Sequence, residues 1–181
     1  MSTYATPPLS EHLPPGSFEV IPSGDGMPTI VVPADRLVEV CRILRDSPAL
    51  RFVVCLDVTA VDHGPREPRF DVVYHFTSPE QRLRLRVHVY ADGADPRVPT
   101  ICDIWPSANW QEREVYDLFG IVFEGHPDLR RLLMPDDWEG HPLRKDYPVQ
   151  VNLPVKTYEP VQLTEEQFRE NIAADRARRG R

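Results

Sequence analysis

The chain has 181 residues, enough for one ordinary domain with an extension, and its 41% hydrophobic and 27% charged residues indicate a packed globular core. The net charge of −7 argues against a nucleic-acid-binding module, which is usually basic because phosphate contacts dominate its affinity. No Lys or Arg precedes Arg36, and no apolar run approaches the roughly 18 residues of a membrane-spanning helix. We therefore expect a cytoplasmic chain without a secretory signal.

The N-terminal third begins with residues 1–16, which are rich in proline, lack periodicity and are expected to form a mobile or extended arm. Residues 18–21 and 29–32 are typical of short strands, joined by a Gly-Asp-Gly turn at 24–26. Pro33 then opens a helix with one apolar face, because apolar side chains recur at i, i+3, i+4 and i+7. These side chains are Leu37, Val40, Cys41 and Leu44.

Three further strands follow along the chain. The apolar run at 52–61 predicts a central strand, and residues 70–77 and 82–90 predict an antiparallel hairpin. Apolar residues in the second hairpin strand alternate with Arg82, Arg84, Arg86 and His88, so the two sets point to opposite faces. The arginine stripe either grips an anionic partner or is a solvated face that discourages edge pairing.

Residues 100–105 predict one more short strand, and residues 109–119 a helix. Asn109 and Glu112 have the spacing of a capping box, and Gly120 is placed as a C-terminal stop. Near the end of the chain, Thr164 and Gln167 form a second capping box that opens a short terminal helix, on which Phe168 and Ile172 share a face.

These elements predict an α+β fold, in which a two-layer domain with a mixed, largely antiparallel sheet and flanking helices carries a long irregular C-terminal extension. We assign residues 1–16 to the arm, 17–120 to the α+β domain and 121–181 to an extended segment with a short terminal helix. A compact domain rarely carries so long an irregular segment, so this extension is expected to wrap partner subunits.

Catalytic and metal-binding motifs are missing from the sequence. The three cysteines, Cys41, Cys55 and Cys102, show none of the usual iron–sulfur or zinc spacings, and the six histidines are scattered. We therefore expect three buried, reduced thiols, and no catalytic, cofactor-binding or metal-binding residue in this chain.

A helical wheel of residues 109–119 separates a core stripe from a charged side. The core stripe holds Gln111, Val115, Leu118 and Phe119, and the opposite side holds Trp110, Arg113, Glu114 and Asp117. An aromatic side chain among charges favours a partner surface. Alternatively, the tryptophan folds back onto the preceding strand, and Arg113 pairs with Asp117 at i, i+4.

Asp117 lies in the last helical turn, where the helix dipole disfavours an anion. Because local rules often break at functional sites, we hypothesise that it meets a cation on another subunit. Beyond the helix, residues 125–131 are echoed by residues 140–145, each with a glycine, a pre-proline histidine and two cations. This pattern predicts an extended segment lying over a neighbour, with Trp138 and Tyr147 as anchors; a phosphate site and a loop satisfied within the domain are the alternatives.

The runs 112–121, 123–131 and 139–148 closely resemble the 30 kDa subunit family of respiratory complex I, the proton-translocating NADH–quinone oxidoreductase. The resemblance implies a structural subunit of the peripheral arm, in its quinone module, with no active site or cofactor of its own. FMN, iron–sulfur clusters and quinone would lie in partner subunits. Those partners would be the large quinone-site subunit and the cluster-bearing subunits of a hetero-oligomer on the cytoplasmic side of the cell inner membrane, which this chain meets only through them.

Residues 109–148 would then lie along the large subunit. The predicted interface residues are Trp110, Glu112, Arg113, Glu114, Tyr116, Asp117, His126, Arg130, Arg131, His141, Arg144, Lys145, Asp146 and Tyr147.

Three rival functions remain at this point. An equivalent subunit of a membrane-bound hydrogenase or of another quinone reductase would share these motifs, so NADH as the electron donor does not follow from them. A free-standing acid–base enzyme would need Glu112, Glu114 or His126 to converge, yet the two glutamates point about 200° apart on a helix. A nucleic-acid module would use the arginine stripe.

Overall fold

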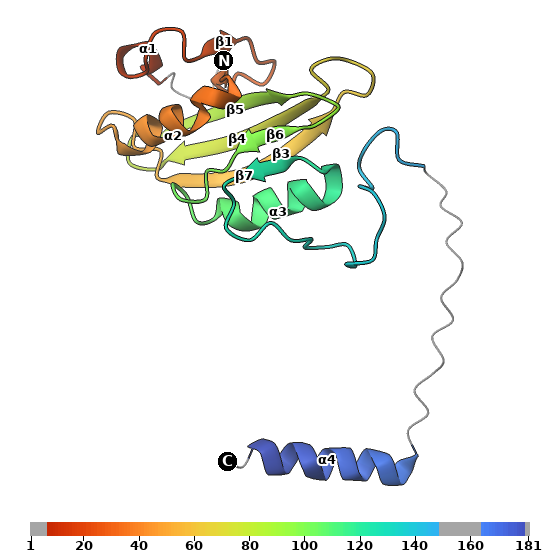
Figure 1. Cartoon of the computed structure of the whole chain (residues 1–181). Coiled ribbons are helices and arrows are strands. Elements are labelled where there is room, and N and C mark those ends of the chain that lie inside the picture. The colour runs from red at the N-terminus through yellow and green to blue at the C-terminus, as the bar shows by residue number, and fades with distance from the viewer. Residues whose placement is uncertain (1–6, 149–163, 180–181) are drawn as a thin grey trace. The chain divides into compact units, whose positions relative to one another are not determined.

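The computed structural model describes residues 7–148 and 164–179. The chain divides into two compact units, residues 1–147 and residues 148–181, and each is described by itself. Within its described part, the second unit is a single helix, α4 (Glu165–Arg179) (Figure 1). Among the helices described, none is both long enough and apolar enough to cross a membrane.

The first unit is built on a five-stranded sheet in the order β1-β2-β5-β4-β3. The β2–β5 pair is parallel, and the three other pairs are antiparallel. The strands are β1 (Glu19–Ile21), β2 (Thr29–Val31), β3 (Val54–Asp62), β4 (Phe70–Ser78) and β5 (Leu83–Ala91). The predicted α+β class, with a mixed and largely antiparallel sheet and flanking helices, is confirmed.

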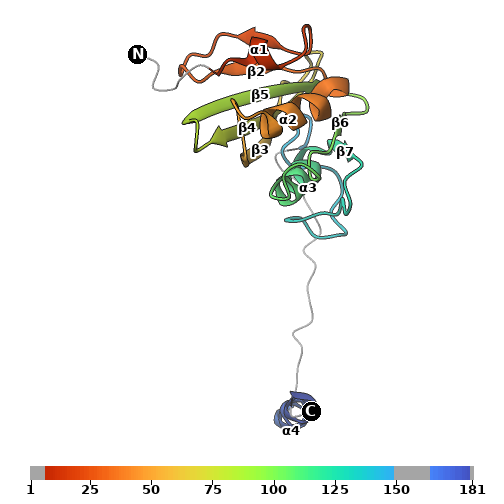
Figure 2. The same ribbon diagram turned by 90° about the vertical axis from the view of Figure 1, so that its left-hand side faces the viewer.

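One face of the sheet packs against helix α2 (Leu37–Asp46), which follows a short 3-10 turn, η1 (Ala34–Arg36) (Figures 1 and 2). The predicted apolar face of this helix is confirmed, because the four side chains that form it are all fully buried. They are Leu37, Val40, Cys41 and Leu44. The alternation in β5 is confirmed as well. Its buried residues are Leu83, Leu85, Val87, Val89 and Ala91, and the arginines and histidine that alternate with them lie on the other face.

Helix α3 (Ala108–Phe119) lies along β3 (Figure 1). It connects β6 (Arg97–Pro99) to β7 (Val122–Glu124), two short parallel strands outside the main sheet. Side chains at its N-terminal end bond to β3, with Gln111 Nε2 donating to the Leu56 carbonyl at 2.9 Å and Ser107 Oγ donating to the Cys55 carbonyl at 3.3 Å. Helix α3 thereby covers part of the free edge of β3, and this hinders the pairing of another strand with that edge.

Two strand predictions need correction. The apolar run at 52–61 becomes β3 at the edge of the sheet, not its centre, because α3 rather than another strand covers it. The strand predicted at 100–105 is wrong. The β6 strand ends at Pro99, and the backbone then turns, with Trp105 N–H donating to the Ile101 carbonyl at 3.0 Å.

The predictions for two helix starts and for the N-terminal arm have different outcomes. The capping box at Asn109 does not form, because Glu112 turns into the protein interior and no side chain caps α3. Part of the predicted arm is ordered, since α1 (Leu9–His12) buries Leu9 and the residue after it, Leu13, is buried too. The capping box of α4 is confirmed by reciprocal bonds between Thr164 and Gln167 at 3.1 and 3.3 Å.

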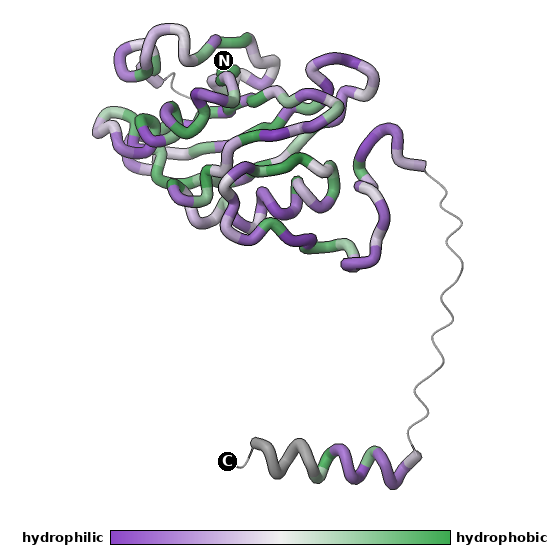
Figure 3. Tube along the Cα trace, in the orientation of Figure 1, coloured by the Kyte–Doolittle hydropathy of each residue, from purple (hydrophilic) through white to green (hydrophobic). Residues whose placement is uncertain are grey.

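The compact unit reaches Tyr147, whereas the predicted domain boundary stood at Gly120. Figure 3 shows the reason for the difference: the segment after β7 is mostly hydrophilic, so hydropathy does not reveal that it packs. The remaining course predicted for the extension, at 149–163, lies outside the described residues.

The core assignment predicts unequal costs for two leucine truncations. Leu44→Ala removes a fully buried side chain between α2 and the sheet and should lower the free energy of unfolding by about 3 kcal/mol. Leu56→Ala is the matched control, because this leucine is 48% exposed on the edge strand, and it should cost under about 1 kcal/mol. Urea unfolding of both variants measures the two values, and equal losses would contradict the assignment.

Candidate partner interface

Helix α3 and the segment after β7 form one hydrogen-bonded substructure. We call residues 125–147 of this segment the strap. The strap contains no helix or strand. Because buried backbone groups must be paired, its polar atoms bond instead to α3 and to the end of the β3–β4 hairpin.

The Asp117 carboxylate is the centre of this substructure. It is fully buried, and its Oδ2 accepts the N–H groups of Leu132, Leu133 and Met134 at 3.0, 2.7 and 2.8 Å. Its Oδ1 accepts from the Arg131 guanidinium at 2.8 Å. Burial raises the pKa of Asp117, but these hydrogen bonds outweigh burial and lower it below its ordinary value. The hypothesis of a cation on another subunit is corrected, since Arg131 of the same chain supplies the cation.

The second half of the strap caps the carbonyl end of α3. The last carbonyls of a helix lack partners within it, and cations are favoured there by the helix dipole. Three donors fill these positions: the His141 ring for the Asp117 carbonyl, the Leu143 N–H for the Leu118 carbonyl and the Arg144 guanidinium for the Phe119 carbonyl. His141 must carry its hydrogen on Nδ1, because a carbonyl can only accept. Burial lowers the pKa of His141.

The first half of the strap is bound along the body of α3. His126 Nε2 donates to the Asn109 carbonyl at 3.1 Å, and the Arg113 guanidinium donates to the carbonyls of Arg130 and Arg131 at 3.1 and 3.2 Å. Arg113 is therefore not paired with an acid at i, i+4. The first echoed run thus contacts α3 from Asn109 to Asp117, whereas the second run contacts only its carboxyl end.

The end of the strap is anchored where the β3–β4 hairpin connects. Arg69 joins the buried Asp62 at 2.7 Å to the exposed Asp146 at 2.8 Å, and the Lys145 N–H also donates to Asp62 at 2.7 Å. Hydrogen bonds from the Arg69 guanidinium are the largest cause of the lowered pKa of both carboxyls. Arg69 and Asp62 could not be identified from the sequence, because no local pattern links them to residues near 146.

The predicted interface residues separate into three groups. Glu112, Arg113 and Asp117 are buried. Tyr116, His126, Arg131, His141, Arg144 and Tyr147 are half-buried, while Trp110, Glu114, Arg130, Lys145 and Asp146 are exposed. Two exposed leucines of the strap, Leu133 and Leu143, were missed, although a leucine in a charged segment was a usable signal.

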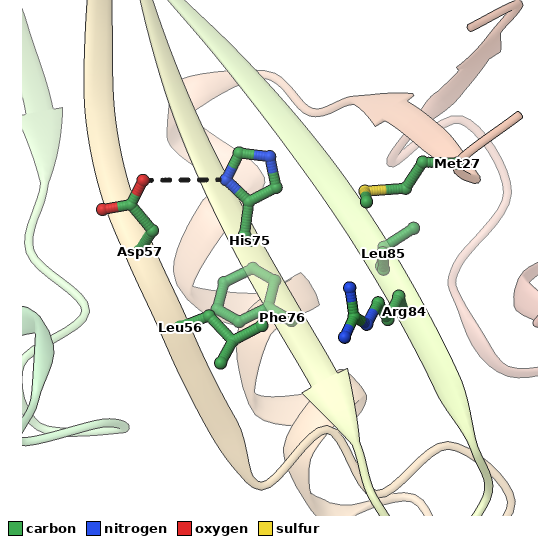
Figure 4. A pocket seen from close by; sticks show the side chains of 7 residues that line it. All are labelled: Met27, Leu56, Asp57, His75, Phe76, Arg84 and Leu85. Atoms are coloured by element: carbon green, nitrogen blue, oxygen red, sulfur yellow. Dashed lines mark ion pairs between the residues drawn. The ribbon is translucent and has the colours of Figure 1, made fainter. Parts of the chain in front are cut away.

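A hollow of about 260 Å³ lies on the sheet and includes Arg84 of the arginine stripe, and Figure 4 shows the side chains that line it. It is lined by Met27, Leu56, Asp57, His75, Phe76, Arg84 and Leu85. His75 lies 4.0 Å from Asp57 and accepts a hydrogen bond from Arg86 Nε at 3.1 Å, and burial, followed by the Arg86 charge, lowers the pKa of His75. Arg86 also pairs with Asp25 at 2.6 Å, so the stripe is partly engaged within the chain.

The residues of the acid–base alternative are not all brought together. Glu114 is exposed, whereas Glu112 is fully buried and accepts the Ile101 N–H at 2.9 Å. Glu112 does lie near His126 and Cys102, and one potential metal-ligand atom of each side chain lies within 4.8 Å of the other two. Burial raises the pKa of Glu112. All three cysteines are buried and free, as predicted.

Residues 30–152, which include the main sheet from β2 onward, α3 and the strap, match the family described as the respiratory-chain NADH dehydrogenase 30 kDa subunit. This chain belongs to that 30 kDa subunit family. The resemblance inferred from the runs at 112–121, 123–131 and 139–148 is therefore confirmed.

Curated relatives in the family are named as subunits of NADH-quinone oxidoreductase. The protein of Saccharopolyspora erythraea is 55% identical over 122 residues, which are 67% of this chain and 49% of the relative. The protein of Geobacter sulfurreducens is 52% identical over 126 residues, 69% of this chain and 76% of the relative. The match thus spans about half the length of the first relative and about three quarters of the second.

Two solved structures resemble this member of the 30 kDa family. A trypsin-resistant fragment of Nqo5 is 38% identical, with a TM-score of 0.52, over 62% of this chain and 89% of that one. A chain of the membrane-bound sulfane sulfur reductase, an archaeal respiratory membrane complex, is 28% identical, with a TM-score of 0.67, over 86% of this chain and 94% of that one.

Removing the Asp117 charge tests its central position. Asp117→Asn should lower the free energy of unfolding of the isolated chain by about 3 kcal/mol at neutral pH, because it leaves Arg131 and three N–H groups poorly paired. Asp128→Asn breaks an exposed ion pair with Arg130 and should cost under about 1 kcal/mol.

The difference in stability between wild type and Asp117→Asn is also predicted to depend on pH. Because the folded pKa of Asp117 is lowered, the carboxylate stabilises the fold above the ordinary aspartate pKa, and this contribution fades as pH falls toward the folded pKa. The stability gap between wild type and Asp117→Asn in urea titrations should therefore shrink in acid. A gap that stays constant to low pH would contradict the assignment.

A glycine substitution tests how closely the strap approaches α3. Gly120 ends the helix at φ 73°, and an added Cβ would overlap the His141 ring and the Arg144 guanidinium. Gly120→Ala should cost about 2 kcal/mol or more, from both backbone strain and displacement of the strap. Gly24→Ala, where a Cβ meets nothing within 4 Å, should stay within about 1 kcal/mol. Thermal unfolding and proteolysis of the strap provide the comparison.

Proposed function

We propose that this chain is a cofactor-free structural subunit of the peripheral arm of a proton-translocating NADH–quinone oxidoreductase. In its quinone module it would hold the large quinone-site subunit and the cluster-bearing subunits in place. Family membership supports this role, as do curated relatives named as subunits of an NADH-quinone oxidoreductase. FMN, iron–sulfur clusters and quinone would belong to those partners, and the chain would meet the cytoplasmic side of the membrane only through them.

The proposal rests on an exposed tryptophan, Trp110, on helix α3, which the strap holds in place. Trp110 is 61% exposed, although the Arg113 guanidinium lies over its ring at 5.0 Å. Arg113 is itself held by two strap carbonyls, and Leu133 of the strap is also 61% exposed. Tryptophan is enriched among the residues that dominate protein–protein affinity, and a pre-ordered side chain loses little entropy on binding.

The strap fits a positional role better than a catalytic one. The buried Arg113 and Asp117 of α3 and the half-buried Arg131 and Arg144 of the strap hold the two segments together. Glu114 of α3 and Arg130 and Lys145 of the strap stay at the surface and can complement a partner's charges. A subunit of this kind would affect electron transfer from NADH to quinone by fixing the distance between its neighbours.

A second candidate is the equivalent subunit of a reductase with a different electron donor. The likeness to the membrane-bound sulfane sulfur reductase favours it, because that likeness covers 86% of this chain with a TM-score of 0.67. The electron donor distinguishes the two candidates.

The test is affinity purification of the tagged full chain from gently solubilised native membranes. Recovery of a large set of partners, together with flavin, iron and NADH–quinone activity, is the expected result. Iron–sulfur clusters without NADH oxidation would favour the second candidate. A monomer that carries no partner and no cofactor would refute both.

Trp110→Ala sharpens this test at one residue. It should weaken the affinity for the partners by roughly 30-fold, which corresponds to a contact worth about 2 kcal/mol, and so reduce their recovery. The stability of the isolated chain should change little. Val20→Ala is the control, because Val20 is 67% exposed on β1, at the other end of the strand order. Equal recovery of the two variants would remove Trp110 from the interface.

A further inference from the structure

Three possible metal ligands lie close together around Glu112 of α3, and of these only His126 also takes part in the contacts that hold the strap. Cys102 follows β6, Glu112 lies on α3, and His126 follows β7. Their ligand atoms all lie within 4.8 Å of one another. The parallel β6–β7 pair and the helix that connects its strands hold the three segments together, so the cluster does not depend on the strap beyond His126.

Two of the three ligands are already in contact. The Cys102 thiol donates to Glu112 Oε2 at 3.2 Å, while Glu112 also accepts the Thr100 hydroxyl at 2.5 Å and the Ile101 N–H at 2.9 Å. Glu112 is fully buried and Cys102 is 7% exposed, whereas His126 is half-buried and lies nearest to solvent. Glu112 is thus oriented by two donors besides the thiol, as metal-binding carboxylates commonly are.

We propose that Cys102, Glu112 and His126 form a site for a thiophilic divalent cation, of which Zn²⁺ is the best match. Zinc takes thiolate sulfur, imidazole nitrogen and carboxylate oxygen, and a site with three protein ligands leaves a fourth position for water. The solvent-facing side at His126 offers that position and a route of entry. A thiolate, a carboxylate and a neutral imidazole would balance the two charges of the cation in a buried place.

Binding releases a proton and changes one histidine contact. The Cys102 thiol has its pKa raised to about 12, mainly by burial, so the cation must displace the thiol proton to solvent. His126 now bonds through both ring nitrogens, Nε2 to the Asn109 carbonyl at 3.1 Å and Nδ1 to the Asp128 N–H at 3.0 Å. One of these bonds must yield to the cation. Asp128 is exposed, so water can replace its lost acceptor.

The proposal does not rest on the assembly function. A cation here would fasten the β6–β7 pair to α3 in the free chain as well as in a complex, so its failure would leave the proposed subunit role unchanged.

The test is a titration of the full chain with Co²⁺ and Zn²⁺ after removal of bound metal. Co²⁺ should produce thiolate-to-cobalt charge-transfer absorption at one equivalent, and Zn²⁺ should abolish it. Cys102→Ser keeps a hydroxyl donor for Glu112 while removing the thiolate. It should lose the band and weaken Zn²⁺ binding by more than the roughly 100-fold upper range for residues that only orient a ligand.

Two further measurements separate a site from incidental binding. Cys55→Ser, a buried cysteine outside the three-ligand cluster, should keep the band and the affinity. Wild-type affinity should rise by on the order of tenfold per pH unit where one proton is released. Absence of the thiolate band, or its persistence in Cys102→Ser with circular dichroism showing both variants folded, would overturn the proposal.

Discussion

The buried carboxylate of Asp117 holds the irregular segment after β7 to the rest of the protein. At the carboxyl end of a helix, an anion is opposed by the helix dipole. Here three consecutive strap N–H groups and the Arg131 guanidinium more than offset that opposition. In return, His141 and Arg144 supply donors to the helix carbonyls. The end of α3 and the strap therefore depend on each other, and neither set of polar groups would be satisfied alone.

Elements with short-range causes could be predicted from the sequence. The apolar stripe of α2, the alternation in β5 and the capping box at Thr164 all depend on neighbours within a few residues, and all three are confirmed. Placement of strands depends on tertiary contacts that leave no such mark. The apolar composition of residues 52–61 indicated burial, but it could not show that α3 would cover an edge strand.

The sequence singled out several residues that form contacts between α3 and the strap, but it did not show what they touch. Asp117 stood out because it breaks a local rule, and it does meet a cation, but that cation lies 14 residues away in the same chain. The Arg69–Asp146 pair spans 77 residues and could not be found from spacing. Glu112 had the spacing of a helix cap, yet the N–H of Ile101 and the hydroxyl of Thr100 draw it into the interior.

Several charged residues in the part of the chain that matches the 30 kDa family form their contacts inside the chain, and such contacts carry no information about a partner. Arg113, Asp117 and Arg131 hold the strap to α3, so any relative that needs this shape has a reason to carry them, whatever its electron donor. The likeness to a sulfane sulfur reductase chain at 28% identity agrees with a shared scaffold. In the proposed assembly, residues that discriminate between partners must instead be exposed on that scaffold, as Trp110 and Leu133 are. Specificity in this family should accordingly be read from the outward side chains of α3 and the strap, and the inward ones report only that the scaffold is present.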